Sequence, residues 1–188
     1  MGVVETPSQT QLAILAELIR RKNRIDDEIA ALVNRPAQLG HVGEFIAARI
    51  FGIRLYVSAV HAHSDGEFCA GTLAGRTVNV KWYPKREDNV DLTPDCACDF
   101  HLVMTGPHSP ATRTVGATRP WVITSVYLFD TQQLLEEQRS RGVRIGVASS
   151  VKQAQWRAAE IYPNANNGLL IMTDEQRRLL ALFAQTAT

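Results

Sequence analysis

Two polar side chains stand two positions apart in the segment GRTVNVKWYPK: Asn79 and Lys81. Alternate residues of an extended strand point to the same face, so Asn79 and Lys81 are predicted to share one face and Val78, Val80 and Trp82 the other. A lysine beside oxygen ligands can position a water and stabilise charge on a phosphate. An amide oxygen can bind a hard cation, although less strongly than a carboxylate does. The alternative is a half-exposed polar face without chemistry.

Two acidic residues precede this strand. Asp65 stands just ahead of the strand expected to form a hairpin with it, and Gly66 permits a bend that aims the carboxylate inward. Glu44 lies in the first turn of the preceding helix. Because Mg²⁺ prefers carboxylates, backbone carbonyls and waters, Asp65, Glu44 and the carbonyl of Val80 are predicted to form a Mg²⁺ site. The structural alternatives are a helix-dipole partner for Glu44 and a turn residue for Asp65.

The order of these residues resembles that of the PD-(D/E)xK nucleases, the restriction-endonuclease-like superfamily. The resemblance covers residues 40–105 and rests on GHVGEFIAARIFG, SDGEF and VNVKWY, followed by a strand-like CDFHLVMTG. It implies Mg²⁺-dependent hydrolysis of DNA, related to restriction or defence. Glu44 and Asp65 would hold the metal, Lys81 would position the attacking water and stabilise charge, and Asn79 would orient water or metal.

The chain departs from this family at Asn79, where the family usually has an acid. Fewer carboxylates weaken Mg²⁺ binding, and Glu67 would replace the missing acid if it faces inward. The resemblance therefore also allows a slow or partner-activated nuclease, working with a specificity subunit or methylase.

The second hypothesis is a non-catalytic module that binds nucleic acid or protein through a degenerate nuclease fold. The third is a helical-interface protein with a purely structural polar cluster. The wider run from RPAQLGHVGEFIA to RPWVITSVYLF also resembles an uncharacterised bacterial family, which adds no mechanism.

Any DNA-binding surface must be a local basic patch, because the formal net charge is only +1. The predicted phosphate contacts are Lys85, Arg86, Arg113 and Arg119, and the alternative for each is an ordinary surface position. The tryptophans are candidates for base stacking where they are exposed, but Trp82 is expected in the core.

A zinc site is the competing metal hypothesis, with Cys96, Cys98 and His101 joined by His61 or His63. Strand alternation argues against it, because it places both cysteines on an apolar face from which His101 points away. The spacing also differs from paired CxxC motifs. Free thiols in the core are therefore the preferred interpretation.

One long amphipathic helix is predicted over residues 8–34, with Ser8 as its N-cap and a break near Asn23. Its apolar stripe docks either on the rest of the chain or on a second copy, as a homodimer. The chain is thus divided into an N-terminal helical extension, residues 1–38, and a nuclease-like domain, residues 39–188.

The remaining pattern predicts the α/β or α+β class, with a mixed sheet flanked by helices. Strands are expected at 53–60, 67–73, 76–83, 98–105, 121–129 and 143–149, helices at 41–51, 131–141 and 174–185, and an exposed loop at 106–120. Asp130 and Thr173 are expected to cap the last two helices. The sequence contains no phosphate-loop fingerprint, no dinucleotide-binding fingerprint and no GxSxG motif.

The sequence favours a cytoplasmic protein. The three cysteines are an odd number, no signal-peptide pattern precedes Pro7, and no apolar run approaches the ~20 residues that cross a bilayer.

Overall fold

The protein was analysed as a computed structural model, which describes residues 9–57, 63–108 and 119–184. The chain divides into two compact units, Met1–Val42 and Gly43–Thr188.

The first unit is built on α1, Gln9–Val33, a continuous helix of 25 residues. The break expected near Asn23 is wrong, because aliphatic residues and good helix formers continue through this region. The helix ends where Asn34 adopts the left-handed conformation, with φ of 55°. The predicted cap, Ser8, lies outside the described residues.

The second unit is built around a six-stranded sheet of order β1-β2-β3-β5-β6-β8. Its strands are β1 Ile53–Leu55, β2 Gly66–Phe68, β3 Thr77–Tyr83, β5 Phe100–Thr105, β6 Ser125–Asp130 and β8 Glu160–Tyr162. The central pair, β3 and β5, is parallel, and the other pairs are antiparallel. A separate two-stranded sheet joins β4, Asn89–Val90, to β7, Ser149–Ser150. The predicted class, a mixed sheet flanked by helices, is confirmed.

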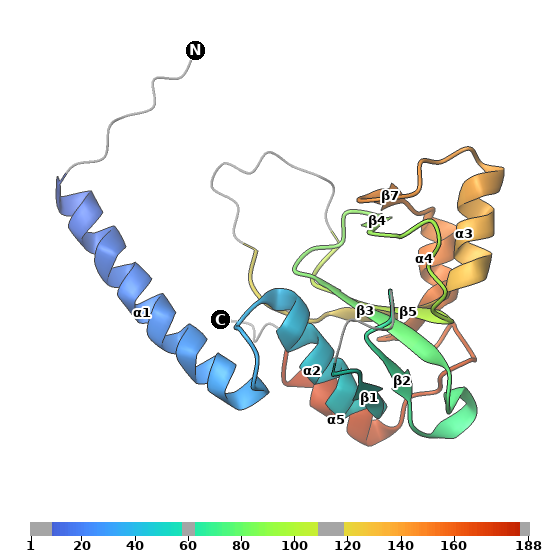
Figure 1. The fold of residues 1–188 in the computed structure, drawn as a ribbon, viewed down its shortest axis with the longest axis horizontal. Coiled ribbons are helices and arrows are strands. Elements are labelled where there is room, and N and C mark those ends of the chain that lie inside the picture. Colours follow the sequence, from blue (N-terminus) through green and yellow to red (C-terminus); the bar gives the residue numbers. More distant parts are fainter. Residues whose placement is uncertain (1–8, 58–62, 109–118, 185–188) are drawn as a thin grey trace, which may run out of the picture. The chain divides into compact units, whose positions relative to one another are not determined.

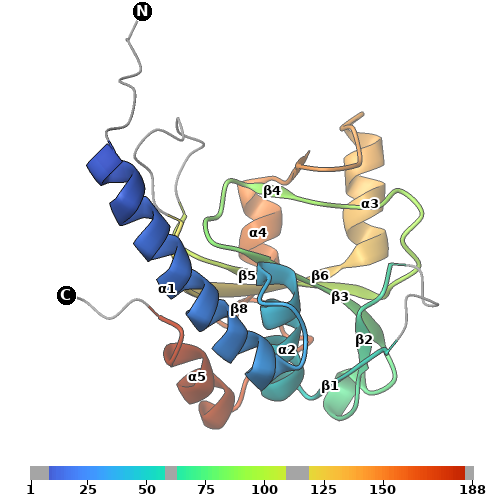
Figure 2. The ribbon, with the colours of Figure 1, turned by 60° about the vertical axis from the view of Figure 1, so that its left-hand side comes forward.

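Helices cover both faces of the sheet (Figures 1 and 2). On one face lie α5, Asp174–Ala181, and α2, Leu39–Phe51, where a Cβ added to Gly43 would stand 3.0 Å from Trp82 Cβ. On the other face lie α3, Thr131–Ser140, and α4, Gln153–Ala159. The side chain of β3 residue Trp82 therefore points toward α2. Asn79 and Lys81, of opposite parity, point to the face covered by α3 and α4.

The caps predicted for α3 and α5 are confirmed. Asp130 Oδ1 accepts a hydrogen bond from Gln133 N at 2.9 Å, at the start of α3. Thr173 and Gln176 form a reciprocal capping box at the start of α5, with bonds of 3.2 and 2.9 Å.

The strand predicted over 98–105 begins later, at Phe100. Asp99 forms a bend before it, because its Oδ2 accepts hydrogen bonds from Thr77 N and Thr77 Oγ1 at 2.7 and 2.9 Å. The strand predicted over 121–129 likewise begins only at Ser125. Strand alternation therefore does not apply to Cys96 and Cys98.

Other predicted strands are replaced by turns. Within 67–73 the strand ends at Phe68, and Gly71, with φ of 73°, opens the single 3₁₀ turn η1, Gly71–Leu73. Within 143–149 only Ser149 is in a strand, because Ser149 Oγ bonds Gly146 N and O at 2.8 Å and closes a turn. The strand from Ile53 ends at Leu55, and residues 58–62 lie outside the described residues. Helix α4 and strand β8 were not predicted.

Two of the three tryptophans are core residues rather than base-stacking platforms. Trp82 is buried and donates from Nε1 to Val122 O at 3.2 Å, as expected for the core. Trp156 is 0% exposed and packs edge-on against Tyr127 and Phe129. Trp121 is 41% exposed and contacts the edge of the Trp82 ring.

Candidate functional site

Asp65 is held by two hydrogen bonds to β3 and one to Tyr56. Its backbone N donates to Val78 O at 2.9 Å, its O accepts from Tyr56 N at 2.9 Å, and its Oδ2 accepts from Val80 N at 2.6 Å. The carboxylate thus lies just before the start of β2, beside β3. The bend expected at Gly66 is wrong: Gly66 is a regular residue of β2, paired with Leu55 and Val78.

Asn79 carries the clearest sign of a missing ligand. Its Nδ2 donates to His63 O at 3.1 Å, and the residue is only 8% exposed. Among the described residues, its Oδ1 has no hydrogen-bond partner. A buried polar atom without a partner is costly, so such an atom commonly marks the place of an ion or a water.

The backbone of Val80 offers a further oxygen. The Val80 N–H points to the β2 side of β3, because it donates to Asp65 Oδ2. The N–H and C=O of one strand residue point to the same side, so the Val80 carbonyl is directed to the side of Asp65. Asp65, Asn79 and Val80 therefore present oxygen atoms at one stretch of β3.

Lys81 is half-buried on the same strand face as Asn79. Its charge acts on His101 and on Cys96, and the charge of Asp65 acts on Cys98. The charges of Asp65 and Lys81 therefore lie close enough to the cysteines to influence them, on the face toward α3. We call these residues and His101 the neighbourhood of Asn79.

The structure does not place Glu44 in this neighbourhood. Glu44 is a half-buried residue of α2, and α2 packs on the opposite face of β3. Its role as a metal ligand stays a prediction. Glu67, the proposed substitute for an acid at position 79, pairs with Thr77 in the sheet register and so shares the Asn79 face. Its carboxylate is an ion-pair partner of Arg54 and accepts from Tyr56 OH at 3.3 Å.

The predicted phosphate contacts are bound to acidic partners. Lys85 Nζ lies 3.4 Å and Arg119 Nη2 3.0 Å from Glu87 Oε1. Arg86 Nε lies 3.2 Å from Asp88 Oδ1, and the guanidinium covers the Trp156 ring at 5.3 Å, so its position is structural. Arg113 lies outside the described residues. The roles of these residues toward DNA stay predictions.

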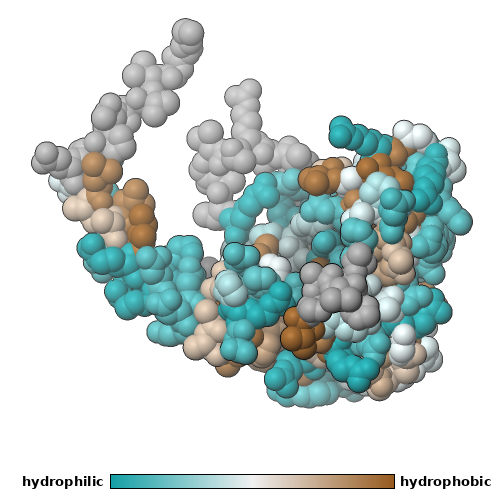
Figure 3. All heavy atoms as spheres, viewed as in Figure 1, coloured by the Kyte–Doolittle hydropathy of each residue, from teal (hydrophilic) through white to brown (hydrophobic). Residues whose placement is uncertain are grey.

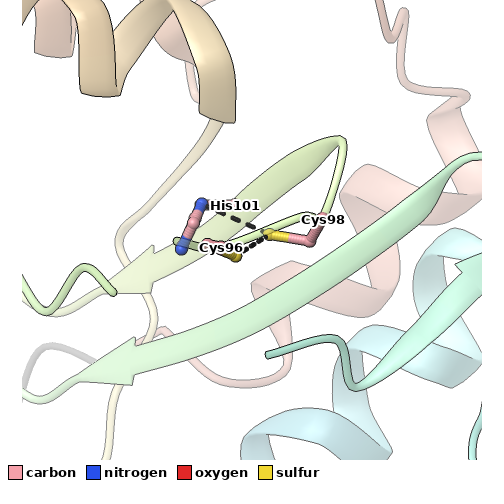
Figure 4. Close-up of side chains that lie close together, drawn as sticks. All are labelled: Cys96, Cys98 and His101. Carbon is pink, nitrogen blue, oxygen red and sulfur yellow. Dashed lines mark hydrogen bonds between the residues drawn. The ribbon is translucent and has the colours of Figure 1, made fainter. Parts of the chain in front are cut away.

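Three buried side chains converge beside the start of β5: Cys96, Cys98 and His101 (Figure 4). Their ligand atoms all lie within 4.8 Å of one another. The two Sγ atoms are 2.6 Å apart, and Cys98 Sγ is 3.8 Å from His101 Nδ1. The alternation argument against this cluster was wrong, because the strand begins only at Phe100 and the chain before it turns back toward His101. His61 lies outside the described residues. His63 contributes its carbonyl, 3.5 Å from Cys96 Sγ.

The cluster shifts the pKa values of its members. The hydrogen bond from the Cys98 thiol lowers the pKa of Cys96 to about 6. The same bond, together with burial, raises the pKa of Cys98. Burial and the charge of Lys81 lower the pKa of His101 to about 4, so this imidazole is neutral at pH 7.

Thr131, the first residue of α3, also contacts the cluster of Cys96, Cys98 and His101. Its Oγ1 lies 2.9 Å from His101 Nδ1 and 3.4 Å from Cys98 Sγ. The adjacent Gln132 donates from Nε2 to Cys96 O at 3.2 Å, which fixes the cysteine loop to α3. Thr131 was not predicted as a site residue, although its position after the predicted cap Asp130 placed it at the start of a helix.

Comparison with known proteins finds neither a family model nor a curated protein that matches this sequence. The described part of the chain has no helix that is both long and apolar enough to cross a membrane.

Proposed function

We propose that this protein is a Mg²⁺-dependent DNA nuclease built on a restriction-endonuclease-like core. The observation that supports this most directly is the buried Oδ1 of Asn79, which has no partner among the described residues. It lies on β3 next to Val80, whose backbone binds the Asp65 carboxylate. An acceptor atom in this position calls for a cation or a proton donor.

The donor set fits a hard cation. A carboxylate, an amide oxygen and a backbone carbonyl are ligands that Mg²⁺ prefers, with water filling the remaining positions. The carboxylate of Asp65 has lone pairs beyond the one that accepts from Val80 N, so this hydrogen bond leaves it able to bind a metal. Asp65, Asn79 and the Val80 carbonyl would hold the ion, whereas Glu44, on the helix that packs on the opposite face of β3, is not part of this donor set.

The chemistry assigned to the chain is hydrolysis of a phosphodiester. Mg²⁺ bound at these oxygens would supply positive charge to a phosphate oxygen and lower the pKa of a bound water. Lys81 adds a fixed ammonium on the same face, where it hydrogen-bonds the attacking water and stabilises charge on the phosphate. Asp65 would hold the metal just before the start of β2, and Asn79 would align the water or metal with its amide oxygen.

The contact with DNA is local, because the net charge is only +1. Lys85 and Arg119 share the carboxylate of Glu87. A bound phosphate would compete with Glu87 for these two cations, which are therefore the proposed backbone contacts. Arg86 is less suited, because it is held in the core by Tyr127 and Trp156.

The proposal predicts that purified protein cleaves DNA in Mg²⁺ or Mn²⁺ and is inactive in EDTA. Plasmid and single-stranded DNA are the substrates, and gel electrophoresis is the measurement. Asp65→Asn should abolish cleavage, because an amide keeps the shape and an acceptor for Val80 N but loses the metal-binding charge. Asp174→Asn, an exposed aspartate at the start of α5, is the matched control and should cleave normally.

Cleavage by Asp65→Asn at the wild-type rate would exclude this site. The specificity subunit or methylase expected as a partner is included in the assay where a candidate is encoded beside the gene. DNA binding in a mobility-shift assay without cleavage, with and without these partners, would favour the second hypothesis, a non-catalytic module with a degenerate nuclease fold.

A further inference from the structure

We propose that Cys96, Cys98 and His101 form a zinc site, separate from the oxygen ligands assigned to Mg²⁺. The three residues are only 3%, 1% and 2% exposed, and their ligand atoms gather within 4.8 Å. Figure 4 shows both sulfur atoms and the His101 ring directed toward one another.

The distances are close to those of a tetrahedral site. Zinc bonds of about 2.3 Å to sulfur and about 2.0 Å to nitrogen separate the ligand atoms by roughly 3.5 to 3.8 Å. Cys98 Sγ and His101 Nδ1 already stand 3.8 Å apart, whereas the two sulfurs, at 2.6 Å, must separate by about 1 Å. Hydrogen bonds to Gln132 and Thr93 hold the backbone of Cys96, so this movement is a rotation of its side chain.

Ligand chemistry selects zinc over magnesium at this cluster. Thiolate sulfur and imidazole nitrogen are zinc ligands, whereas Mg²⁺ takes oxygen. Two thiolates and one Zn²⁺ sum to zero charge, which permits their burial. Three protein ligands leave a fourth position for water.

Thr131 is placed to act on this site from outside the ligand set. When His101 Nδ1 binds zinc, its contact with Thr131 Oγ1 is lost. The hydroxyl can then donate to Cys98 Sγ, which it already approaches at 3.4 Å. Hydrogen bonds of this kind to a metal-bound thiolate orient the ligand.

The test measures metal content rather than activity. The full chain is purified reduced and metal-free, exposed to Zn²⁺, separated from unbound metal, and analysed by mass spectrometry for zinc. Wild type should retain about one zinc per chain, because the described residues contain one such cluster. Cys98→Ser should retain almost none, and Cys69→Ser, which changes the exposed cysteine, should match wild type.

Co²⁺ provides a second readout. Bound cobalt should give a thiolate-to-metal charge-transfer absorption that is absent in Cys98→Ser and weakened in His101→Gln. Circular dichroism confirms that each variant is folded, and His101→Gln replaces Cys98→Ser if that variant unfolds. Equal zinc in wild type and variants, or none in wild type, would overturn the proposal. A disulfide between Cys96 and Cys98 that persists in place of zinc binding would also overturn it. None of these results depends on DNA cleavage, so the failure of this site and the failure of the nuclease are separate outcomes.

A second inference concerns α1, which exposes a row of large aliphatic side chains. Seven of them are 48% to 74% exposed: Leu12, Ile14, Leu15, Leu18, Ile19, Ile25 and Leu32. Figure 3 shows part of this apolar surface on the N-terminal half of α1, at the upper left. An apolar surface of this length on an exposed helix marks an interaction site.

We infer that the occupant of this surface is α1 of a second copy, in a parallel coiled coil. The spacing alternates between three and four residues along Leu15, Leu18, Lys22, Ile25, Ile29 and Leu32, which is the a/d pattern of a heptad repeat. The one polar residue in this row, Lys22, forms an ion pair with Asp26 on its own helix. A single lysine at an a position specifies register and favours two strands.

The flanking charges are complementary in the parallel orientation. Arg21 occupies a g position and Asp26 the following e position, so Arg21 of one helix faces Asp26 of the other. This pairing occurs on both sides of the two-fold axis. The attraction between these unlike charges therefore favours the parallel orientation.

The full chain is therefore expected to be a dimer by light scattering coupled to size-exclusion chromatography. Leu18→Glu combined with Ile25→Glu should give a monomer, because charges replace two d positions. Arg24→Glu, at an outward c position, introduces the same residue and should leave the dimer intact. Ile25→Cys in a Cys69→Ser background should form a disulfide between chains when the helices are parallel.

A monomeric wild type, or a dimer that survives both glutamates, would refute this interface. A dimer without the Ile25→Cys disulfide would refute the parallel orientation.

Discussion

Replacement of Lys81 by alanine is expected to lower the rate of DNA hydrolysis by about 10²-fold or more, the usual effect of removing one group that stabilises transition-state charge. The lysine lies two residues beyond Asn79 on the same face of β3, and its charge reaches His101 and Cys96. Because Lys81 is only half-buried, alanine leaves the sheet intact, and the loss should appear in kcat rather than in folding.

Lys152→Ala is the matched control for this experiment. Lys152 is exposed and precedes α4, and its bond to Gln155 uses the backbone N, which alanine retains. Rates are measured on a fluorescent oligonucleotide in Mg²⁺ at saturating DNA. Equal rates for Lys81→Ala and wild type would remove Lys81 from the mechanism, whereas equal losses in both lysine variants would show a general charge effect.

Trp156→Ala is expected to lower the free energy of unfolding by about 3 to 5 kcal/mol, the usual cost of deleting a large buried aromatic side chain. Its ring lies edge-on to Tyr127 at 4.6 Å and to Phe129 at 5.1 Å, with the Arg86 guanidinium 5.3 Å from its centre. Alanine would leave a cavity beneath α4 and remove the surface on which Arg86 rests. Urea denaturation followed by far-ultraviolet circular dichroism measures the change.

Two further variants test this interpretation. Trp156→Phe keeps an aromatic ring in the core, and Trp156 Nε1 has no hydrogen-bond partner among the described residues, so this change should cost less than alanine. Trp121→Ala removes a tryptophan that is 41% exposed and should also cost less. A loss in Trp121→Ala as large as that in Trp156→Ala would contradict the assignment of Trp156 to the main core.

Several helices and strands could be predicted from sequence patterns that involve only neighbouring residues. The alternation of Val78, Val80 and Trp82 identified β3 and its apolar face, because the burial of strand residues has a period of two. Asp130 and Thr173 marked the starts of α3 and α5, because capping depends on side chains within one turn of the helix. The position of Asp65 beside β3 follows from the hairpin expected between β2 and β3, not from the predicted bend at Gly66, which is a regular strand residue.

Features that depend on contacts between distant residues were not predictable in this way. The bend at Asp99 arises from Thr77, which is remote in sequence, and this bend brings Cys98 to the same side as His101. Helix α4 has only seven residues, too few for a clear period, and the burial of Trp156 fixes it in place. The side of the sheet covered by α2 likewise depends on packing against Trp82.

The parallel pairing of β3 with β5 bears on when the site forms during synthesis. The two strands are joined by residues 84–99, which contain no helix of the kind that usually supports a parallel crossover. Such non-local pairing forms slowly and needs further strands for stability. β6, which pairs along the whole of β5, and Thr131 are made only afterwards. A ribosome-bound chain that stops before β6 therefore contains every residue from Glu44 to Lys81, yet it lacks the strand that pairs with β5 and the Thr131 hydroxyl that contacts Cys98 and His101.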